Sequence, residues 1–346
     1  MGLGMRYILT SAAIFLILST AILARQDNQI TVSGKVVNEE TGAPLENVNI
    51  FLSNTTIGTT TAKNGEFIIT NIPYGTYDII FSCVGYQTEK QSFSSYQPAI
   101  LNFNVTLKMK MINLSPVNVT GSIPKDWKEN LNIFTKLFIG ETINAEDTKI
   151  LNPEVLYFVK DDKTNSFKAY ADSVIKVQND ALGYLLYVVL DSLEYNPRKN
   201  SLMFICYPRF EELPAASEDQ KRTWENNRQK AFLDSPKHFY YDLVHHLLDK
   251  DYFILHETTG EGVFSEDLDI SCDSDSTVYN FNYIGGLVIQ RSLNNLPDIL
   301  HFRYPSVRID KYGNLLTSYY AVATYGEWSQ LRIADLLPLN YVYQEE

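Results

Sequence analysis

His238, Asp242 and His245 are the side chains whose types and spacing come closest to a metal site in this sequence. Residues 238 and 245 would lie two turns apart on one helical face, with Asp242 four residues after His238. Imidazole nitrogens and a carboxylate oxygen can ligate zinc, but a fourth ligand would have to come from elsewhere in the chain. Surface and helix-end roles account for the same residues, so the sequence predicts no metal ion and no cofactor.

A second group, in the stretch RTWENNRQKAF, combines cationic and aromatic side chains. Arg222, Trp224 and Arg228 would lie close together on a helix, where a guanidinium group could bind phosphate or stack on the indole. A helix that packs through Trp224 and Phe232 and keeps its charges in water explains the same pattern. Both interpretations stay open, and the packed helix is favoured.

The densest acidic stretch is EDLDISCDSDS, residues 266–276. Its first aspartates begin like a calcium-binding loop. However, Cys272 stands where the sharp turn of such a loop needs glycine, and Val278 stands where the bidentate glutamate belongs. The stretch is therefore predicted to be a solvated acidic loop.

The elements that would position these residues begin with a β-rich module at residues 29–110. Short runs of alternating apolar residues are separated by turn residues at about ten-residue intervals, which is typical of a two-sheet sandwich of about seven strands. The dipeptide Asn64-Gly65 predicts a tight hairpin, because a primed turn needs positive φ at both central positions. The predicted core between the sheets comprises Val32, Gly34, Val36, Val48, Ile50, Leu52, Phe67, Ile69, Tyr77, Ile79 and Phe81.

The turns and strands of this module carry a set of motif residues with structural roles: Gly34, Pro44, Gly58, Gly65, Phe67, Pro73, Gly75, Tyr77, Gly85 and Tyr86. In these residues the module resembles the carboxypeptidase-like regulatory domain. The resemblance implies a transthyretin-like or immunoglobulin-like β-sandwich, found beside zinc carboxypeptidases and at the head of exported bacterial proteins and outer-membrane transporters. One departure is Thr61-Ala62, where the family usually has Thr-Asp before the Gly-x-Phe turn.

The family name does not carry a peptidase site into this chain. Zinc carboxypeptidases hold their metal with His-x-x-Glu and a later histidine, and the five histidines here form no such motif. His-Glu-x-x-His and Gly-x-Ser-x-Gly are also absent from the sequence. No catalytic residue is therefore predicted. The enzyme alternative would need a pocket in which an aspartate meets at least two of His238, His245, His256 and His301.

The second half of the chain predicts an α+β domain at residues 131–346, after a linker at 111–130. Strand-like runs surround about two central helices, at residues 217–233 and 234–250. Several sequence segments of this domain resemble those of exported bacterial proteins that join one carboxypeptidase-like regulatory domain to an α+β region of no assigned activity. In the linker, residues 113–121 are similar to the stretch that can dock a TonB-type energising protein, although Pro116 weakens strand addition.

The N-terminus and the composition bear on location. One cation, a 17-residue apolar run from Ile8 to Ala24 and a polar continuation predict a signal peptide at residues 1–24, with an uncleaved anchor as the alternative. No later run predicts a membrane-spanning helix. The net charge of −12 disfavours nucleic acid as a partner. Three widely spaced cysteines predict buried thiols, with a disulfide as the alternative.

These features lead to three functional hypotheses. The first is a non-enzymatic protein of a Gram-negative cell envelope, located in the periplasm, at the outer membrane or on the cell surface. In it the sandwich is a spacer or docking module, and the C-terminal domain binds a protein or a glycan. The second is a component of an outer-membrane TonB-type uptake system. The third is a hydrolase or metal-dependent enzyme with a dispersed His and Asp site.

Overall fold

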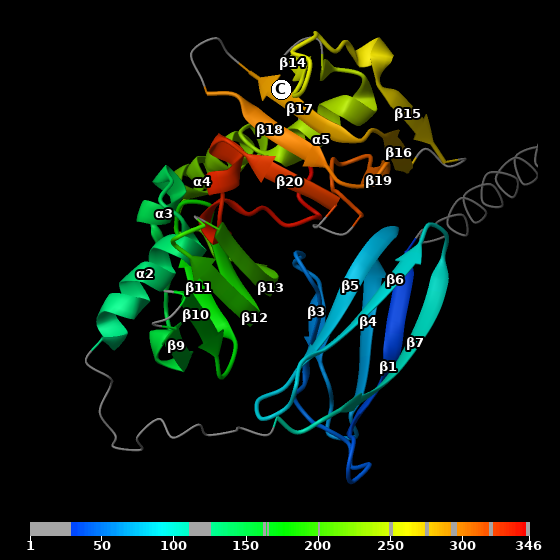
Figure 1. Cartoon of the computed structure of the whole chain (residues 1–346). Coiled ribbons are helices and arrows are strands. Elements are labelled where there is room, and N and C mark those ends of the chain that lie inside the picture. The colour runs from blue at the N-terminus through cyan, green and yellow to red at the C-terminus, as the bar shows by residue number, and fades with distance from the viewer. Residues whose placement is uncertain are drawn as a thin grey trace, which may run out of the picture.

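The structure is a computed structural model with three β-rich parts in sequence order (Figure 1). The predicted signal peptide and residues 113–121 of the predicted linker lie outside the described residues. The described residues are 29–110, 126–161, 164, 166–199, 201–248, 252–273, 277–291, 296–317 and 321–343.

The first part is a sandwich of seven strands, which confirms the predicted fold class. In one sheet β1 lies between antiparallel β4 and parallel β7, and in the other the order is β3-β2-β5-β6. Nearly all the residues predicted for the core are buried between the sheets, and the rings of Phe67 and Phe81 pack edge to face at 5.8 Å. The strands are β1 Ile30–Asn38, β2 Asn49–Leu52, β3 Gly58–Thr60, β4 Glu66–Ile72, β5 Gly75–Ser82, β6 Glu89–Ser95 and β7 Ala99–Leu107.

The prediction of a primed hairpin at Asn64-Gly65 is wrong. Gly65 has a φ of +78°, but Asn64 is not among the residues with positive φ. The turn itself is present, because the amide of Ala62 donates to the carbonyl of Glu66 at 2.9 Å. However, β3 and β4 belong to different sheets, so the chain crosses the sandwich here instead of closing a two-stranded ribbon.

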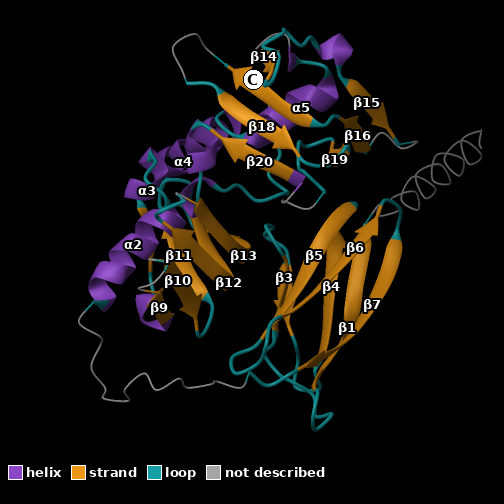
Figure 2. Cartoon of the chain, viewed as in Figure 1, coloured by secondary structure: helices purple, strands orange, loops and turns teal. Residues whose placement is uncertain are grey.

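The second part is a six-stranded antiparallel sheet covered on one side by helices (Figure 2). Its order is β8-β11-β12-β10-β9, and β13 pairs along the other edge of β12. The strands are β8 Thr148–Ile150, β9 Leu156–Asp161, β10 Ser166–Ala171, β11 Ile175–Asn179, β12 Tyr184–Asn196 and β13 Ser201–Glu212. The helices are α2 Trp127–Ile139, α3 Ile143–Glu146 and the 3-10 turn η1 Pro153–Val155.

Helix α2 was not predicted, and it begins inside the range assigned to the linker. Phe134 and Phe138 are fully buried against the sheet, with ring centroids 4.8 Å apart. The indole of Trp127 donates to the carbonyl of Leu156 at 3.0 Å, which fixes the first turn of α2 to the start of β9. The region after the sandwich therefore has helical structure from residue 127, ahead of the predicted start at 131.

The third part has its own core, separate from the core under α2. Helices α4 Glu218–Leu233 and α5 Pro236–His245 correspond to the two predicted helices. Helix α4 contacts the six-stranded sheet of the second part, whereas α5 packs on a four-stranded sheet of order β14-β17-β18-β20. The strands are β14 Phe253–His256, β15 Asp269–Cys272, β16 Val278–Asn282, β17 Gly285–Gln290, β18 Asp298–Phe302, β19 Ser306–Asp310 and β20 Val322–Tyr325. The 3-10 turns of this part are η2 Ser265–Asp267 and η4 Glu327–Gln330, whereas η5 Ile333–Asp335 packs in the core under α2.

Two local predictions need correction. Part of the acidic stretch predicted as a loop is strand β15, which pairs with β16 in a three-stranded sheet with β19. The three cysteines are free, as favoured, but none matches the predicted burial, because Cys83 and Cys206 are half-buried and Cys272 on β15 is exposed. In the described part of the chain, no helix is long and apolar enough to cross a membrane.

The segment near the C-terminus bridges the three parts. The ammonium group of Lys237, near the start of α5, lies 3.4 to 3.5 Å from the carbonyl oxygens of Pro338, Leu339 and Tyr341. The side chain of Asn340 donates to Thr56 of the sandwich at 2.8 Å. Lys237 therefore anchors a strap that runs from the third part to the sandwich.

Lys237 gives a pH-dependent prediction. Desolvation lowers its pKa to about 8, whereas an unfolded lysine titrates near about 10.4. Between these values the unfolded chain binds more protons than the native chain, so this lysine makes stability rise with pH. We expect the free energy of unfolding of the wild type, minus that of Lys237→Met, to increase from about pH 7.5 to about pH 9.5. Equilibrium denaturation across this range measures the difference, and a flat or falling difference would contradict the prediction.

Candidate functional site

The sandwich is attached to the second and third parts by backbone pairing through the loop after β2. The amide of Asn54 donates to Pro208 at 2.7 Å, and the amide of Phe210 donates to Thr55 at 2.8 Å. Thr55 and Arg209 thus form a parallel bridge between the loop and β13. The amide of Leu339 also donates to Asn54, at 2.6 Å. These bonds fix the orientation of the sandwich relative to the six-stranded sheet.

A small apolar cluster lies beside these hydrogen bonds. Phe51, Ile80 and Val189 are 2%, 0% and 8% exposed and pack together, with Val174 and Tyr207 at the margin. Phe51 and Ile80 belong to the face of their sheet that points away from the sandwich core. These side chains are buried only because the sandwich meets the six-stranded sheet, so the two parts are in packed contact.

Gly58 lets β3 approach this interface closely. A Cβ atom at Gly58 would lie 2.9 Å from the Cβ of Phe51 and 3.1 Å from the Cδ of Arg209. The guanidinium group of Arg209 in turn stacks on the ring of Tyr187 at 4.5 Å. One of the family motif residues therefore lies where the sandwich meets β13.

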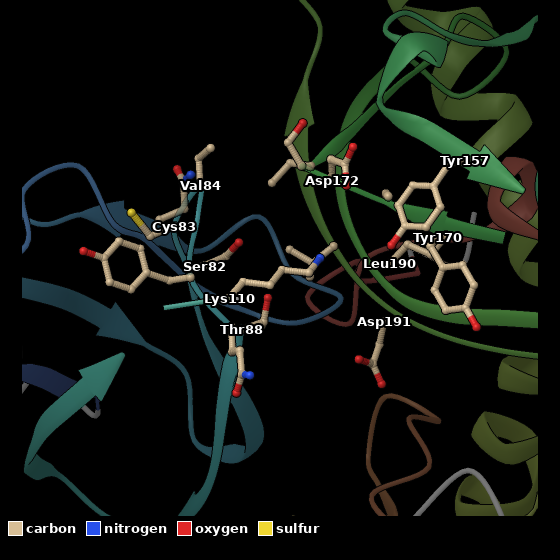
Figure 3. A pocket seen from close by; sticks show the side chains of 17 residues that line it. Ser82, Cys83, Val84, Thr88, Lys110, Tyr157, Tyr170, Asp172, Leu190 and Asp191 are labelled. Carbon is tan, nitrogen blue, oxygen red and sulfur yellow. The ribbon is translucent and has the colours of Figure 1, made fainter. Parts of the chain in front are cut away.

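Next to the interface is a cleft of about 500 Å³ with walls from both parts (Figure 3). This volume is within the usual range for small-molecule sites in proteins. One wall comes from the end of β5, the loop after it and the segment after β7. The other wall comes from β9, β10, β12 and the turn between β10 and β11. The residues that line the cleft include Ser82, Cys83, Val84, Thr88, Lys110, Tyr157, Tyr170, Asp172, Ser173, Leu190 and Asp191.

Two tyrosines form an aromatic platform on the wall from the six-stranded sheet. Tyr157 on β9 and Tyr170 on β10 are directly opposite each other in the antiparallel register. Their rings stack with centroids 5.3 Å apart and planes 18° apart. Tyr157 remains 39% exposed, and burial and the Asp172 carboxylate raise its pKa. The phenol of Tyr157 therefore stays neutral near pH 7, and a tyrosine hydroxyl can both donate and accept hydrogen bonds.

Two carboxylates lie on the same wall as the tyrosines. Asp172 follows the end of β10, and its amide donates to the carbonyl of Val155 at 2.9 Å. Asp191 is the extra residue of a bulge in β12, because the pairing with β13 shifts between Leu190 and Ser192. Bulges re-aim a side chain and are frequent beside functional sites. Both aspartates are exposed, and neither forms an ion pair with any residue in the described ranges.

The sandwich contributes one cation and a thiol to the opposite wall. The amide of Lys110 donates to Gly85 at 2.9 Å, which holds the segment after β7 against the loop after β5. Burial raises the pKa of the Cys83 thiol, so it stays protonated at neutral pH and is a poor nucleophile. The cleft therefore combines flat aromatic surface, two carboxylates, an ammonium group and hydroxyls.

The structure does not assemble a metal site from His238, Asp242 and His245. His238 Nε2 lies 3.1 Å from Asp242, and its Nδ1 lies 2.9 Å from the hydroxyl of Tyr252. His245 instead packs on Tyr241, with its Nε2 2.9 Å from the carbonyl of Lys311. Across the described ranges there is no cluster of three His, Cys, Asp or Glu side chains that could hold a metal ion.

The other two histidines are also in separate places. His256 hydrogen-bonds the hydroxyl of Tyr283 at 2.7 Å, and His301 pairs with the carboxylate of Glu257 at 2.9 Å. None of the three described cavities is lined by two histidines. The observation that would have favoured a dispersed His and Asp enzyme site is therefore missing from the described residues.

The arginines and tryptophan of α4 hold the helix against the sheet. The indole of Trp224 donates to the carbonyl of Asp180 at 2.7 Å. Arg228 donates to the carbonyl of Leu182 at 2.7 Å and stacks on the ring of Tyr184 at 4.0 Å. Arg222 is 73% exposed and reaches Asp219, 3.6 Å away. These contacts match the packed-helix interpretation, and the cation stacks on a tyrosine of β12, not on Trp224.

The family motif residues of the sandwich have structural surroundings. A Cβ at Gly34 would lie 1.9 Å from the carbonyl oxygen of Phe103 on β7, and Gly65 and Gly85 have φ of +78° and +84°. Tyr86 accepts a hydrogen bond from Asn38 at 3.1 Å. The others lie in turns, bridges and the sandwich core: Pro44, Phe67, Pro73, Gly75 and Tyr77.

The chain thus joins an N-terminal β-sandwich to a larger β-rich region that contains the second and third parts. Residues 32–119 match the family model described as CarboxypepD_reg-like domain. The N-terminal sandwich is thus a domain of that family, as the motif residues predicted. This regulatory-like domain is non-catalytic, so the match assigns no reaction to the rest of the chain.

Similar solved structures cover only part of the chain, and no curated protein matches it. A type II cohesin–X–dockerin complex from Acetivibrio cellulolyticus is 24% identical over 23% of this chain and 56% of its own, with a TM-score of 0.20. The group B streptococcus pilus 2b backbone protein is 18% identical over 23% and 41%, also at 0.20. A 3-chlorocatechol 1,2-dioxygenase from Rhodococcus opacus is 13% identical over 24% and 60%, again at 0.20. The chain spans about half the length of these structures. Because the TM-scores are only 0.20, these similarities assign no function to the chain.

Proposed function

We propose that the chain is a non-enzymatic, exported protein of a bacterial cell envelope that binds its ligand in the cleft between the sandwich and the six-stranded sheet. The observation that carries this proposal is the cleft of about 500 Å³ with walls from both parts. Its size and its mixture of aromatic and polar side chains are typical of ligand sites. Export rests on residues 1–24, which have the pattern of a signal peptide.

Because its interface with the six-stranded sheet is packed, the sandwich is part of the binding site and more than a spacer. A free spacer would be joined to the C-terminal region by the chain alone. Here Phe51, Ile80 and Val189 are buried between the two parts, and Lys110 of the sandwich forms part of the cleft wall. The sandwich is therefore half of the binding site, and removing it would remove a wall.

Filling the cleft tests the proposal. Mature wild-type chain, residues 25–346, is immobilised and exposed to soluble material from envelope fractions, and the retained carbohydrate and protein are measured. In Ser173→Trp the indole fills the cleft, whereas Ser271→Trp adds the same bulk to an exposed position of β15, far along the chain from the cleft. We expect retention by the wild type and by Ser271→Trp, and a loss of about tenfold or more with Ser173→Trp. Equal retention by all three proteins would contradict the proposal.

A further inference from the structure

We infer that the cleft binds a neutral saccharide, which stacks on Tyr157 and Tyr170 and hydrogen-bonds to Asp172 and Asp191. This inference rests on the proposed function and names the ligand class of the same site. The two rings stack with an offset on adjacent strands, with centroids 5.3 Å and planes 18° apart, so their faces are nearly parallel and form a stepped aromatic surface (Figure 3). Such a surface is complementary to the apolar C–H face of a pyranose ring.

The polar groups of the cleft suit the rim of a sugar ring. A neutral sugar offers many hydroxyl donors, and ionised carboxylates are acceptors only. Asp172 and Asp191 lie on the same wall as the tyrosines, and neither is engaged by a cation in the described part of the chain. Hydrogen bonds to a charged group are stronger than those between neutral groups, so two carboxylates can fix the orientation of bound hydroxyls.

The bulge in β12 supports a role for Asp191 in binding. A regular strand would place residue 191 in the ladder opposite a residue of β13, but the register passes from Leu190–Cys206 to Ser192–Ile205 and leaves Asp191 without a partner in the ladder. Asp191 is one of the residues that line the cleft (Figure 3). An irregularity that directs a carboxylate into a cavity has no evident benefit for the stability of the sheet.

The charges of the cleft favour a neutral saccharide over an anionic one. Lys110 supplies one ammonium group from the sandwich, and the opposite wall carries the two carboxylates. A ligand carboxylate or sulfate next to the tyrosines would be repelled by Asp172 and Asp191. The overall charge of −12 acts in the same direction at long range. Lys110 can donate to the ring or hydroxyl oxygens of a neutral sugar from the other side.

The size of the cleft disfavours a folded protein as the occupant. Stable protein interfaces bury about 1,200–2,000 Å² and have an apolar core. The described apolar cluster beside the cleft, formed by Phe51, Ile80 and Val189, is already buried in the contact between the two parts. The lining of the cleft itself mixes tyrosine, aspartate, lysine and hydroxyl side chains with single aliphatic residues from several elements.

The test uses mature chain, residues 25–346, on an array that carries neutral oligosaccharides, anionic oligosaccharides and peptides. We expect binding to at least one neutral oligosaccharide, confirmed by calorimetric titration. Tyr170→Ala should weaken that binding by about tenfold, because it removes the stacking surface, and Tyr170→Phe should keep it within about threefold. Asp191→Asn tests the carboxylate at an exposed position, where folding is not at risk, and should weaken binding by about fivefold.

Tyr325→Ala is the matched control, because Tyr325 is 51% exposed on β20 and lies outside the cleft lining. It should bind like the wild type. Binding only to anionic oligosaccharides or peptides would overturn the inference, and so would no binding to the array. Equal effects of Tyr170→Ala and Tyr325→Ala would also overturn it. If Ser173→Trp still abolishes retention of envelope material in those cases, the ligand class is wrong but the proposed cleft stands.

Discussion

Replacing Ile80 with aspartate will separate the sandwich from the six-stranded sheet and abolish binding in the cleft. Ile80 is fully buried against Phe51 and Val189 in the interface, and it is not part of the sandwich core. An unpaired carboxylate at this position would cost about 3–5 kcal/mol as long as the interface stayed closed. Because each part has its own core, the chain can avoid this cost by opening the interface without unfolding either part.

Small-angle scattering and amide exchange measure this separation. The radius of gyration should increase, and the amides of Phe210 and Leu339, which donate to Thr55 and Asn54, should lose protection. Ile68→Asp is the control, since it makes the same change at a side chain that is 58% exposed on β4. It should leave scattering, exchange and binding unchanged. An Ile80→Asp protein with wild-type scattering and binding would mean that the interface does not hold the cleft together.

Replacing Gly183 with alanine should cause a large loss of stability in the six-stranded sheet. Gly183 has a φ of +70°, which costs a residue with a Cβ about 1–2 kcal/mol. The new Cβ would also lie 2.3 Å from the indole of Trp224, which cannot withdraw easily because it is buried and bonded to Asp180. Overpacking of this kind costs a further amount of about 1–3 kcal/mol. The expected total is about 2–5 kcal/mol.

Gly260→Ala separates the two causes of this loss. Gly260 has the same φ of +70°, but nothing lies within 4 Å of the position of its Cβ. It should therefore show only the backbone cost of about 1–2 kcal/mol. Chemical denaturation of both variants gives the difference. Equal losses would show that Trp224 does not pack on Gly183 as described.

The sandwich could be predicted because its signals are local. Val32, Val36 and Ile50 alternate with polar residues, and turn glycines separate the runs, so strand period and turn chemistry agree. Strand β6 has a weaker local signal, because the segment Glu89–Ser95 has only one large apolar residue, Phe93. Such an edge strand is defined by its pairing with β5, which the sequence of the segment does not encode.

The sequence of helix α2 has apolar residues at helical spacing, but the linker-like residues before it favour a different interpretation. Trp127, Leu131, Phe134 and Phe138 follow one another at helical spacing. The prolines and glycine at residues 116, 121 and 124 favoured a linker through residue 130, and the strand-like runs after residue 134 hid the helical period. The helical spacing of these apolar residues is therefore a better indicator of structure here than the prolines and glycine of the preceding segment.

The cleft could not be predicted because it depends on register and on contacts between parts. Tyr157 and Tyr170 meet only because β9 and β10 pair in one particular register. Asp191 reaches the cleft through a bulge, and Lys110 faces them only after the sandwich has packed on β13. The sequence instead indicated His238 and Arg228 as candidate site residues, because they lie at helical spacing from other polar residues. In the structure their contacts hold helices in place.

If the cleft is the ligand site, its walls will contact the ligand in the envelope. The most direct measurement is photo-crosslinking of the full chain in cells, with p-benzoylphenylalanine in place of Val84, which is 77% exposed on the cleft wall. The same substitution at Ser271 on β15 is the reference. We expect a crosslinked adduct at position 84 that is absent at position 271 and is lost when Ser173→Trp is added. Adducts at position 271 alone, or an adduct at position 84 that survives Ser173→Trp, would contradict it.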